Sequence, residues 1–299
     1  MKIKSYDAAP GRSSVRIAPF RSAQRAWALG TLLFTRPEVW KLVGKPFIHA
    51  HWGAKERVQR LLDHHIIARR LGRPFNLPLN NFADIIVLEE ISPSYRLKID
   101  NPKWVLEDGL LTLSIWDEAD RLFSIHFIFG YRDHETVAYI GGVQGRRGEN
   151  VRDQYRAFAK DAEDLHPSHI LVELFRSLCA TIGINRILAV SNECRHQQAR
   201  YFSQRRGYAD PVSLDYNSLW HERGGVLLED LYDLSLILPE RDLATVRRNK
   251  RGRHSARRLL YTLLQSRLQE ALNNPGRTAI FRHDTTLSNT SSRFRRTLA

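Results

Sequence analysis

The sequence predicts a mixed α/β protein of the α+β kind, with a mostly antiparallel sheet flanked by helices. Apolar and polar residues alternate through residues 111–115 and again through 123–129, on either side of a turn, which is the pattern of a β-hairpin. Apolar residues at four-residue spacing in residues 170–182 predict a helix that Gly183 ends. The β-branched and aromatic segment 136–142 predicts a further strand, which enters a glycine-rich turn.

The remaining elements extend this pattern into a single α/β domain over residues 23–240. A chain of 299 residues with 42% hydrophobic content is long enough to bury one large core. Residues 1–22 show no periodicity and are predicted to be a loose basic arm. The other expected elements are three helices within 22–70, weak strands at 84–91 and 94–99, a buried strand at 187–190, a short helix at 196–206 and final strands at 212–220 and 226–238.

The positive charge is concentrated at the C-terminus. The formal net charge is +14, and residues 241–299 hold 14 Lys and Arg against 3 Asp and Glu, a local +11 that leaves +3 for the other 240 residues. This distribution argues against a globular body shaped around a nucleic-acid backbone. It favours a separate basic segment at the end of the chain.

Residues 241–273 are predicted to form that segment as a basic amphipathic helix, and residues 274–299 a disordered polar tail. Seven Lys and Arg lie within residues 247–258. Four leucines follow on one helical side: Leu260, Leu263, Leu264 and Leu268. Such a helix binds an anionic inner-membrane surface through residues 247–272, or docks its leucines on the domain. Nucleic acid is the less favoured partner, because no Phe or Trp interleaves the cluster for base stacking.

The composition also predicts a cytoplasmic location, peripheral to the inner membrane if the basic helix binds there. No segment approaches the ~18 consecutive apolar residues of a membrane-spanning helix, and the first residues lack the apolar stretch of a secretory signal. Cys179 and Cys194 give neither a disulfide framework nor a zinc spacing. Neither His49 with His51 nor His64 with His65 has a third ligand at a useful spacing, so no metal site is predicted.

The glycine-rich turn after residue 140 is the first candidate site. Gly141, Gly142, Gly145 and Gly148 fall within eight residues and let the backbone approach another group closely. Side-chain donors accompany them. The predicted anion or cofactor site comprises Gly142, Gln144, Gly145, Arg146 and Gly148, together with Arg147. The alternative is a tight turn with solvated arginines.

The segment 215–222 is the second candidate site, because it concentrates an acid, a phenol, an indole and an imidazole. Asp215, Tyr216 and Trp220 are predicted to line a substrate cleft, with Glu222 or His221 as the proton-accepting base. On the expected strand Tyr216, Trp220 and Glu222 share one face. The alternative is a capped, hydrogen-bonded strand end.

Cys194 and His196 form a third candidate pair, a nucleophile and its base two residues apart. Activation requires the two groups within hydrogen-bond reach, which this spacing in a turn does not secure. We therefore treat the pair as the least favoured of the three candidates.

The order of elements resembles the GNAT acyltransferase fold. In that fold two neighbouring strands splay apart and hold the pantetheine and pyrophosphate of acyl-coenzyme A, with the phosphates at the N-terminus of the following helix. The resemblance implies that segments 136–142 and 187–191 are those strands and that acyl-coenzyme A, or a similar phosphate-bearing donor, is the cofactor. We expect an insertion of about twenty residues between the glycine-rich turn and the helix at residue 170.

A second resemblance, over roughly residues 27–273, is to the VirK/YbjX family of bacterial proteins. The residues that carry it are YIGGVQG at 139–145, VSN at 190–192, DYNSLWHERGG at 215–225, LPER at 238–241 and the basic helix around 247–261. The chain departs from the family pattern at Asn217, where we expect Asp. With the GNAT resemblance, the VSN motif adds Ser191 and Asn192 to the predicted cofactor site.

The two resemblances imply an acyltransferase linked to virulence and cell-envelope remodelling, which acts near the inner membrane. A non-catalytic envelope-stress factor that helps to localise a surface protein is the alternative. A nucleic-acid-binding protein that uses the basic tail is the second alternative.

Overall fold

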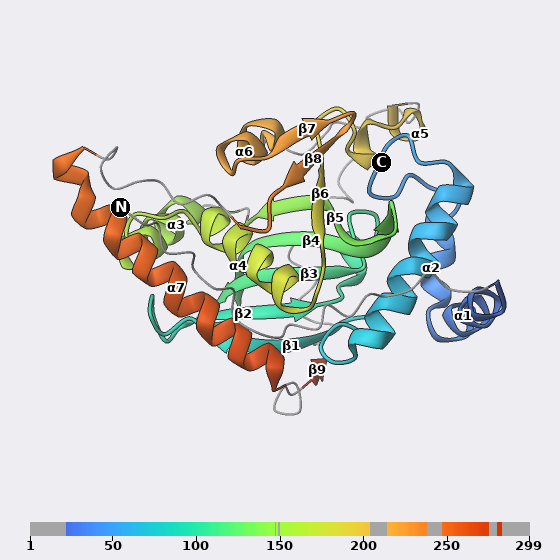
Figure 1. Ribbon diagram of the computed structural model, residues 1–299, viewed down its shortest axis with the longest axis horizontal. Helices are drawn as coiled ribbons and strands as arrows, with labels where there is room; N and C mark the ends of the chain where they lie inside the picture. Colours follow the sequence, from blue (N-terminus) through green and yellow to red (C-terminus); the bar gives the residue numbers. More distant parts are fainter. Residues whose placement is uncertain are drawn as a thin grey trace, which may run out of the picture.

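The protein forms one open sheet of mixed α/β architecture, in agreement with the predicted fold class (Figure 1). The computed structural model describes residues 22–146, 148, 150–203, 214–237, 247–274 and 280–282. Within these residues nine strands pair in the order β7-β8-β6-β5-β4-β3-β2-β1-β9. Only β5 and β6 run parallel among the described strands, and every other neighbouring pair is antiparallel.

The hairpins and strands predicted from alternation are present, and the sheet continues beyond them at both edges. The strands are β1 (Asn81–Val87), β2 (Tyr95–Asp100), β3 (Leu111–Asp117), β4 (Asp120–Arg132), β5 (Glu135–Gly145), β6 (Arg186–Val190), β7 (Val226–Leu228), β8 (Leu231–Leu234) and β9 (Ile280–Arg282). The expected strand at 226–238 is therefore a tight hairpin of β7 and β8.

Helices precede the sheet, cross over between its strands and close the chain. They are α1 (Ser22–Thr35), η1 (Pro37–Leu42), α2 (Ala54–Leu71), η2 (Lys103–Val105), α3 (Val151–Asp161), α4 (Pro167–Thr181), η3 (His196–Gln198), α5 (Arg200–Ser203), α6 (Tyr216–Glu222), η5 (Arg248–Lys250) and α7 (Arg251–Asn273). The three helices expected within residues 22–70 are α1, η1 and α2. The predicted arm lies outside the described residues, as does nearly all of the predicted tail.

The sheet has one apolar face, which α4 covers together with α3 and α7 (Figure 1). Phe127 of β4 packs edge-on against Phe175 of α4, with ring centroids 4.9 Å apart. Tyr95 of β2 meets Phe158 of α3 in the same way at 4.8 Å. The opposite face of β2, β3 and β4 carries buried polar side chains: Lys98, Asp100, Thr112, Ser114, Ser124 and His126.

One predicted element is wrong, and one helix was not predicted. Residues 216–222 form the helix α6 rather than part of a strand, with Asp215 as its N-cap. Tyr216 and Trp220 are four residues apart, and this spacing places them on one face of a helix as well as of a strand. Between the glycine-rich turn and α4 the chain forms the helix α3, a segment rich in charged residues in which only Phe158 is buried.

The basic helix α7 docks on the domain through its leucines. Leu260, Leu264 and Leu268 are buried against α4 and β1, as the docking alternative expects, while Leu263 is 44% exposed. Charged contacts add to this packing, since Arg253 pairs with Asp164 at 2.8 Å. The described part of the C-terminal segment is therefore part of the folded body.

Replacement of a docked leucine tests this packing directly. We expect Leu264→Ala to lower the free energy of unfolding by about 2–5 kcal/mol, because Leu264 is fully buried and the substitution leaves a cavity. The matched control is Leu259→Ala, since Leu259 is 60% exposed on the same helix, and its effect should stay within about 0.5 kcal/mol. Equal effects in urea denaturation would show that α7 does not dock.

Candidate functional site

The parallel pair β5–β6 separates at its C-terminal end. Its ladder runs from Val137–Arg186 to Ile140–Ala189 and stops there. Farther along β5, the Val143 N–H donates to the Tyr216 hydroxyl at 2.8 Å, and this hydroxyl donates to the Val143 carbonyl at 3.0 Å. On the β6 side, the Trp220 indole N–H donates to the Val190 carbonyl at 2.9 Å. The ladder therefore ends one residue before β6 ends, and two aromatic side chains of α6 bond backbone groups of the two strands beyond it.

The glycines of β5 admit a neighbour from the chain itself. A Cβ atom on Gly141 would lie 2.3 Å from the Asp108 carbonyl oxygen, and one on Gly142 would lie 2.9 Å from the Asp108 Cβ. Both separations are shorter than side-chain packing allows. The close approach that the glycine run predicts is thus made here by the segment that carries Asp108.

A short segment between η1 and α2 ties the loops at this end of the sheet together. The Ile48 N–H donates to the Glu107 carbonyl at 2.8 Å, and the Ile48 carbonyl accepts from the His196 N–H at 3.1 Å. The Ala50 N–H donates to the Cys194 carbonyl at 2.8 Å. Ile48 itself has φ of 60°, a left-handed conformation that β-branched residues rarely adopt. Strain of this kind persists where the surrounding structure fixes it, often at functional sites.

The first titratable cluster of the site is Asp108 between two imidazoles. The Asp108 carboxylate lies 3.1 Å from His196 Nδ1 and 3.7 Å from His126 Nδ1, and it accepts a hydrogen bond from the Gln197 amide at 3.2 Å. Both imidazoles are buried, and a fifth of the Asp108 side chain is exposed. Burial by itself raises the pKa of Asp108, but His196 and then His126 outweigh it and hold this pKa well below its usual range.

The two imidazoles differ in their second nitrogen. His126 Nε2 lies 2.9 Å from the Ser124 hydroxyl, which is also buried and lies 3.2 Å from the Gln144 carbonyl. No described residue bonds Nε2 of His196, whose ring is buried beside Phe202. His196 is therefore the better candidate for proton transfer.

The second cluster is His49, Cys194 and Asp230. His49 Nε2 lies 3.0 Å from an Asp230 carboxylate oxygen, and Cys194 Sγ lies within 4.8 Å of both groups. Burial lowers the pKa of His49 against the opposing attraction of Asp230. Burial also raises the pKa of the Cys194 thiol, which a hydrogen bond with Ser191 partly offsets. The structure thus pairs Cys194 with His49, and His196 with Asp108, rather than Cys194 with His196.

The predicted residues Asn192 and Asp215 build the start of α6. The Asn192 amide donates to Asp215 Oδ1 at 2.7 Å, and its Oδ1 accepts from the Tyr216 N–H at 2.9 Å. Hydrogen bonds from Ser218 first, and then from Asn192, lower the pKa of Asp215 to about 2. Asn217 donates its side-chain amide to the Glu193 carboxylate at 3.2 Å, which an Asp at this position could not do.

The predicted phosphate turn leads directly into a helix. Gln144 and Gly145 pair with β4, and the Arg146 N–H bonds to the Leu122 carbonyl at 2.9 Å. The Arg146 guanidinium pairs with Asp120. The insertion of about twenty residues expected before the helix at residue 170 is present, and it forms the helix α3 from Val151. Gly148 adopts φ of 146°, which favours glycine at this position.

The predicted bases lie apart from both clusters. His221 and Glu222 are exposed on the last turn of α6, and Glu222 faces His169 of α4 at 3.8 Å. No contact among the described residues joins either of them to Asp108 or His49. Sequence reasoning missed Asp108, His126 and Asp230, because they are distant in sequence and belong to no local motif.

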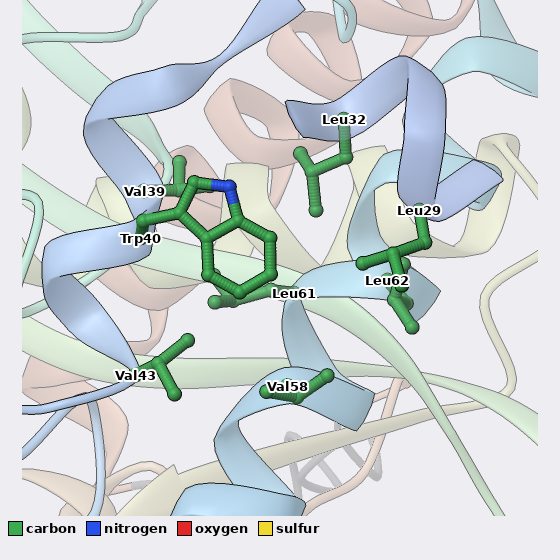
Figure 2. Close-up of a pocket in the computed structure, with 8 residues that line it drawn as sticks. All are labelled: Leu29, Leu32, Val39, Trp40, Val43, Val58, Leu61 and Leu62. Atoms are coloured by element: carbon green, nitrogen blue, oxygen red, sulfur yellow. The ribbon is translucent and has the colours of Figure 1, made fainter. Parts of the chain in front are cut away.

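A hollow among the described residues lies elsewhere, between α1, η1 and α2 (Figure 2). It leaves no enclosed space for even a water molecule, whereas small-molecule pockets begin at roughly 300 Å³. Its lining is almost wholly apolar: Leu29, Leu32, Val39, Trp40, Val43, Val58, Leu61 and Leu62. This hollow is unsuited to a phosphate-bearing donor.

The fold and the site define an α/β protein with buried His–Asp clusters where a parallel strand pair ends. Residues 18–272 match the family described as "Protein of unknown function (DUF535)", and the chain belongs to this family. It is 22% identical to the uncharacterized protein YbjX of Escherichia coli K12, over 80% of this chain and 74% of that protein. It is also 22% identical to an uncharacterized protein of Haemophilus influenzae, over 76% of this chain and 73% of that protein.

These relatives confirm the resemblance to the VirK/YbjX family. No solved structure matches the chain significantly. The resemblance to the GNAT fold therefore stays a prediction from the order of elements. Among the described helices none is long and apolar enough to cross a membrane.

Removal of the Tyr216 hydroxyl tests how this end of the strand pair is held. We expect Tyr216→Phe to lower the free energy of unfolding by about 1–3 kcal/mol, because it leaves the buried N–H of Val143 without its partner. Tyr201→Phe is the control, since Tyr201 lies in the short helix α5 and is only partly buried. A Tyr216→Phe protein as stable as the parent in urea denaturation would contradict this account.

Proposed function

We propose that the protein is an acyltransferase that uses acyl-coenzyme A or a similar phosphate-bearing thioester at the end of the β5–β6 pair. The observation that carries this proposal is the Asp108–His196 pair beside the end of the β5–β6 ladder. A carboxylate that orients one imidazole nitrogen and leaves the other unbonded is the arrangement of a general base.

The chemistry assigns the proton to His196. An amine or hydroxyl acceptor gives its proton to His196 Nε2 as its nitrogen or oxygen bonds to the thioester carbonyl carbon. The carbon–sulfur bond then breaks, and the same proton passes to the departing thiolate. The Asp108 carboxylate stabilises the imidazolium between these steps, because it is held ionised.

The donor would extend along β5 towards the N-terminus of α3. Gly148 and the first N–H groups of α3 suit its phosphates, since a helix N-terminus favours anions. Its thioester arm would run past Gln144 and Gly142 to the end of the β5–β6 ladder. The Tyr216 hydroxyl is hydrogen-bonded to the Val143 backbone at this point, so the hydroxyl must move away before the donor can enter. In this proposal the α6 residues line the entrance.

Two experiments test the proposal. Coenzyme A and acetyl-coenzyme A should raise the unfolding temperature, and the increase should grow with ligand concentration. At a ligand concentration 100 times the dissociation constant, the free energy of unfolding should rise by about 2.7 kcal/mol. His196→Gln should keep this response but slow release of the coenzyme A thiol, with a panel of amine and alcohol acceptors, by about 10²–10⁴-fold.

His221→Gln and Glu222→Gln are the matched controls, because these residues are the bases predicted from the sequence. If either change slows the reaction and His196→Gln does not, the base assignment is wrong. If no coenzyme A derivative changes the unfolding temperature, the proposal that the donor is a coenzyme A thioester is wrong.

A non-catalytic binding protein is the second candidate, and β7 favours it. Among the described strands β7 is an edge strand of the sheet. Its three apolar residues are exposed: Val226 by 61%, Leu227 by 50% and Leu228 by 43%. An exposed apolar edge strand is suited to pairing with a strand of another protein. A folded protein that gives no response to any donor favours this candidate.

We further propose that the protein is cytoplasmic and binds the inner membrane peripherally through the basic turn η5, which leads into α7. Arg248 and Lys250 of η5 are exposed, whereas the buried leucines of α7, which are Leu260, Leu264 and Leu268, face the domain. Attachment would then be electrostatic rather than by insertion of an apolar face. The envelope-related role implied by the VirK/YbjX resemblance requires an acceptor at such a surface.

Charge reversal tests this attachment. We expect the double variant Arg248→Glu and Lys250→Glu to lose binding to anionic vesicles in sedimentation, since each nearby basic residue contributes about 1 kcal/mol. The control reverses Arg152 and Arg156, two exposed arginines of α3, and should bind like the parent. If both variants lose vesicle binding equally, the net charge of the protein and not the position of these two residues determines binding.

A further inference from the structure

Three side chains from distant parts of the sequence meet beside the end of β6. The imidazole of His49, the thiol of Cys194 and the carboxylate of Asp230 each offer one ligand atom, and these atoms all lie within 4.8 Å of one another. His49 and Cys194 are buried, while 44% of the Asp230 side chain is exposed. The proposed acyl transfer uses none of the three.

The register of the sheet places two of these groups. Leu231 of β8 pairs with Val190 of β6, so Asp230 lies beside the start of the loop that carries Cys194. The Cys194 N–H closes that loop with a hydrogen bond to the Ser191 carbonyl at 3.2 Å. Asp230 leaves the β7–β8 turn directly after Glu229, which has φ of 59°.

The third group, His49, is held by the strained segment at Ile48. His49 forms an isolated β-bridge with Arg195, next to Cys194 in the chain. Its ring stacks on Trp52 with centroids 5.6 Å apart. The strained backbone at Ile48 thus positions the imidazole of His49 beside the thiol and the carboxylate.

The arrangement differs from a catalytic relay. In a relay the histidine uses one nitrogen for the nucleophile and the other for the acid. Here Nε2 of His49 faces Asp230 at 3.0 Å, and Cys194 Sγ lies within 4.8 Å of a ring nitrogen of His49 and of an Asp230 oxygen. The other nitrogen, Nδ1, accepts the His51 N–H at 3.2 Å. Nε2 is therefore the nitrogen of His49 that is left for a ligand, and three ligand atoms within 4.8 Å of one another can bind one ion.

We propose that His49 Nε2, Cys194 Sγ and an Asp230 oxygen bind a divalent cation of the zinc class. Thiolate, imidazole and carboxylate together suit zinc better than magnesium or calcium, which prefer oxygen ligands alone. Three protein ligands leave a coordination position open. Because Asp230 is the exposed member, that position faces the solvent side and is accessible to water or a small ligand.

Binding has a defined proton balance. The cation bonds to the Cys194 sulfur, and the thiol proton is released to solvent. His49 keeps one proton, which moves from Nε2 to Nδ1 as Nε2 bonds to the cation. The His51 N–H must then turn away from Nδ1, so the segment that carries His49 rearranges locally.

Cobalt(II) is the probe, because its bond to a thiolate gives a charge-transfer absorption. This absorption disappears when zinc replaces the cobalt. Chelator-treated full-length protein titrated with Co²⁺ should develop this absorption with one equivalent, and Zn²⁺ should abolish it. Cys194→Ser should remove the band. Cys179→Ser, which changes the chain's other cysteine, should leave it unchanged.

Asp230→Asn provides a second test on an exposed turn, where the fold is least disturbed. It should weaken Co²⁺ binding by more than about tenfold, whereas Glu229→Gln beside it should not. Absence of the band in the parent protein, or a band that survives Cys194→Ser, overturns the proposal. The result does not depend on any acyl donor, so it is separate from the outcome for acyl transfer.

Discussion

The contact between Asp108 and the glycines of β5 is the constraint on which the rest of the site depends. Gly141 and Gly142 carry no Cβ, and this alone lets the segment after η2 lie against the strand. Asp108 is then within reach of both His126 on β4 and His196 after β6. A buried carboxylate is stabilised by such partners, and in return it orients the imidazole beside the end of the β5–β6 ladder.

A second constraint joins the two His–Asp clusters. The segment at Ile48 bonds to the Glu107 loop on one side and to the loop of Cys194 and His196 on the other. Any displacement of this segment would therefore move His49 and His196 together. The strained φ of Ile48 is compatible with such a role, because the surrounding hydrogen bonds determine its position.

Much of the sheet could be predicted because its signals are local. Alternation gave the hairpin of β3 and β4, and four-residue spacing gave α4. The failures have equally local causes: the segment of α3 is rich in charged residues and buries only Phe158, and Tyr216 and Trp220 satisfy the helix and strand periods alike. Of the candidate site, the glycine run correctly predicted a close neighbour for β5 but not which one.

The sequence by itself determined the fold class, the family and the need for close approach at Gly141 and Gly142, since periodicity and residue type are properties of short segments. Only the tertiary structure decided that Asp108 is the neighbour and that His49 meets Cys194 and Asp230. These groups lie on separate strands and loops, and strand register together with a few backbone hydrogen bonds sets their distances. Such long-range geometry has no counterpart in local sequence pattern.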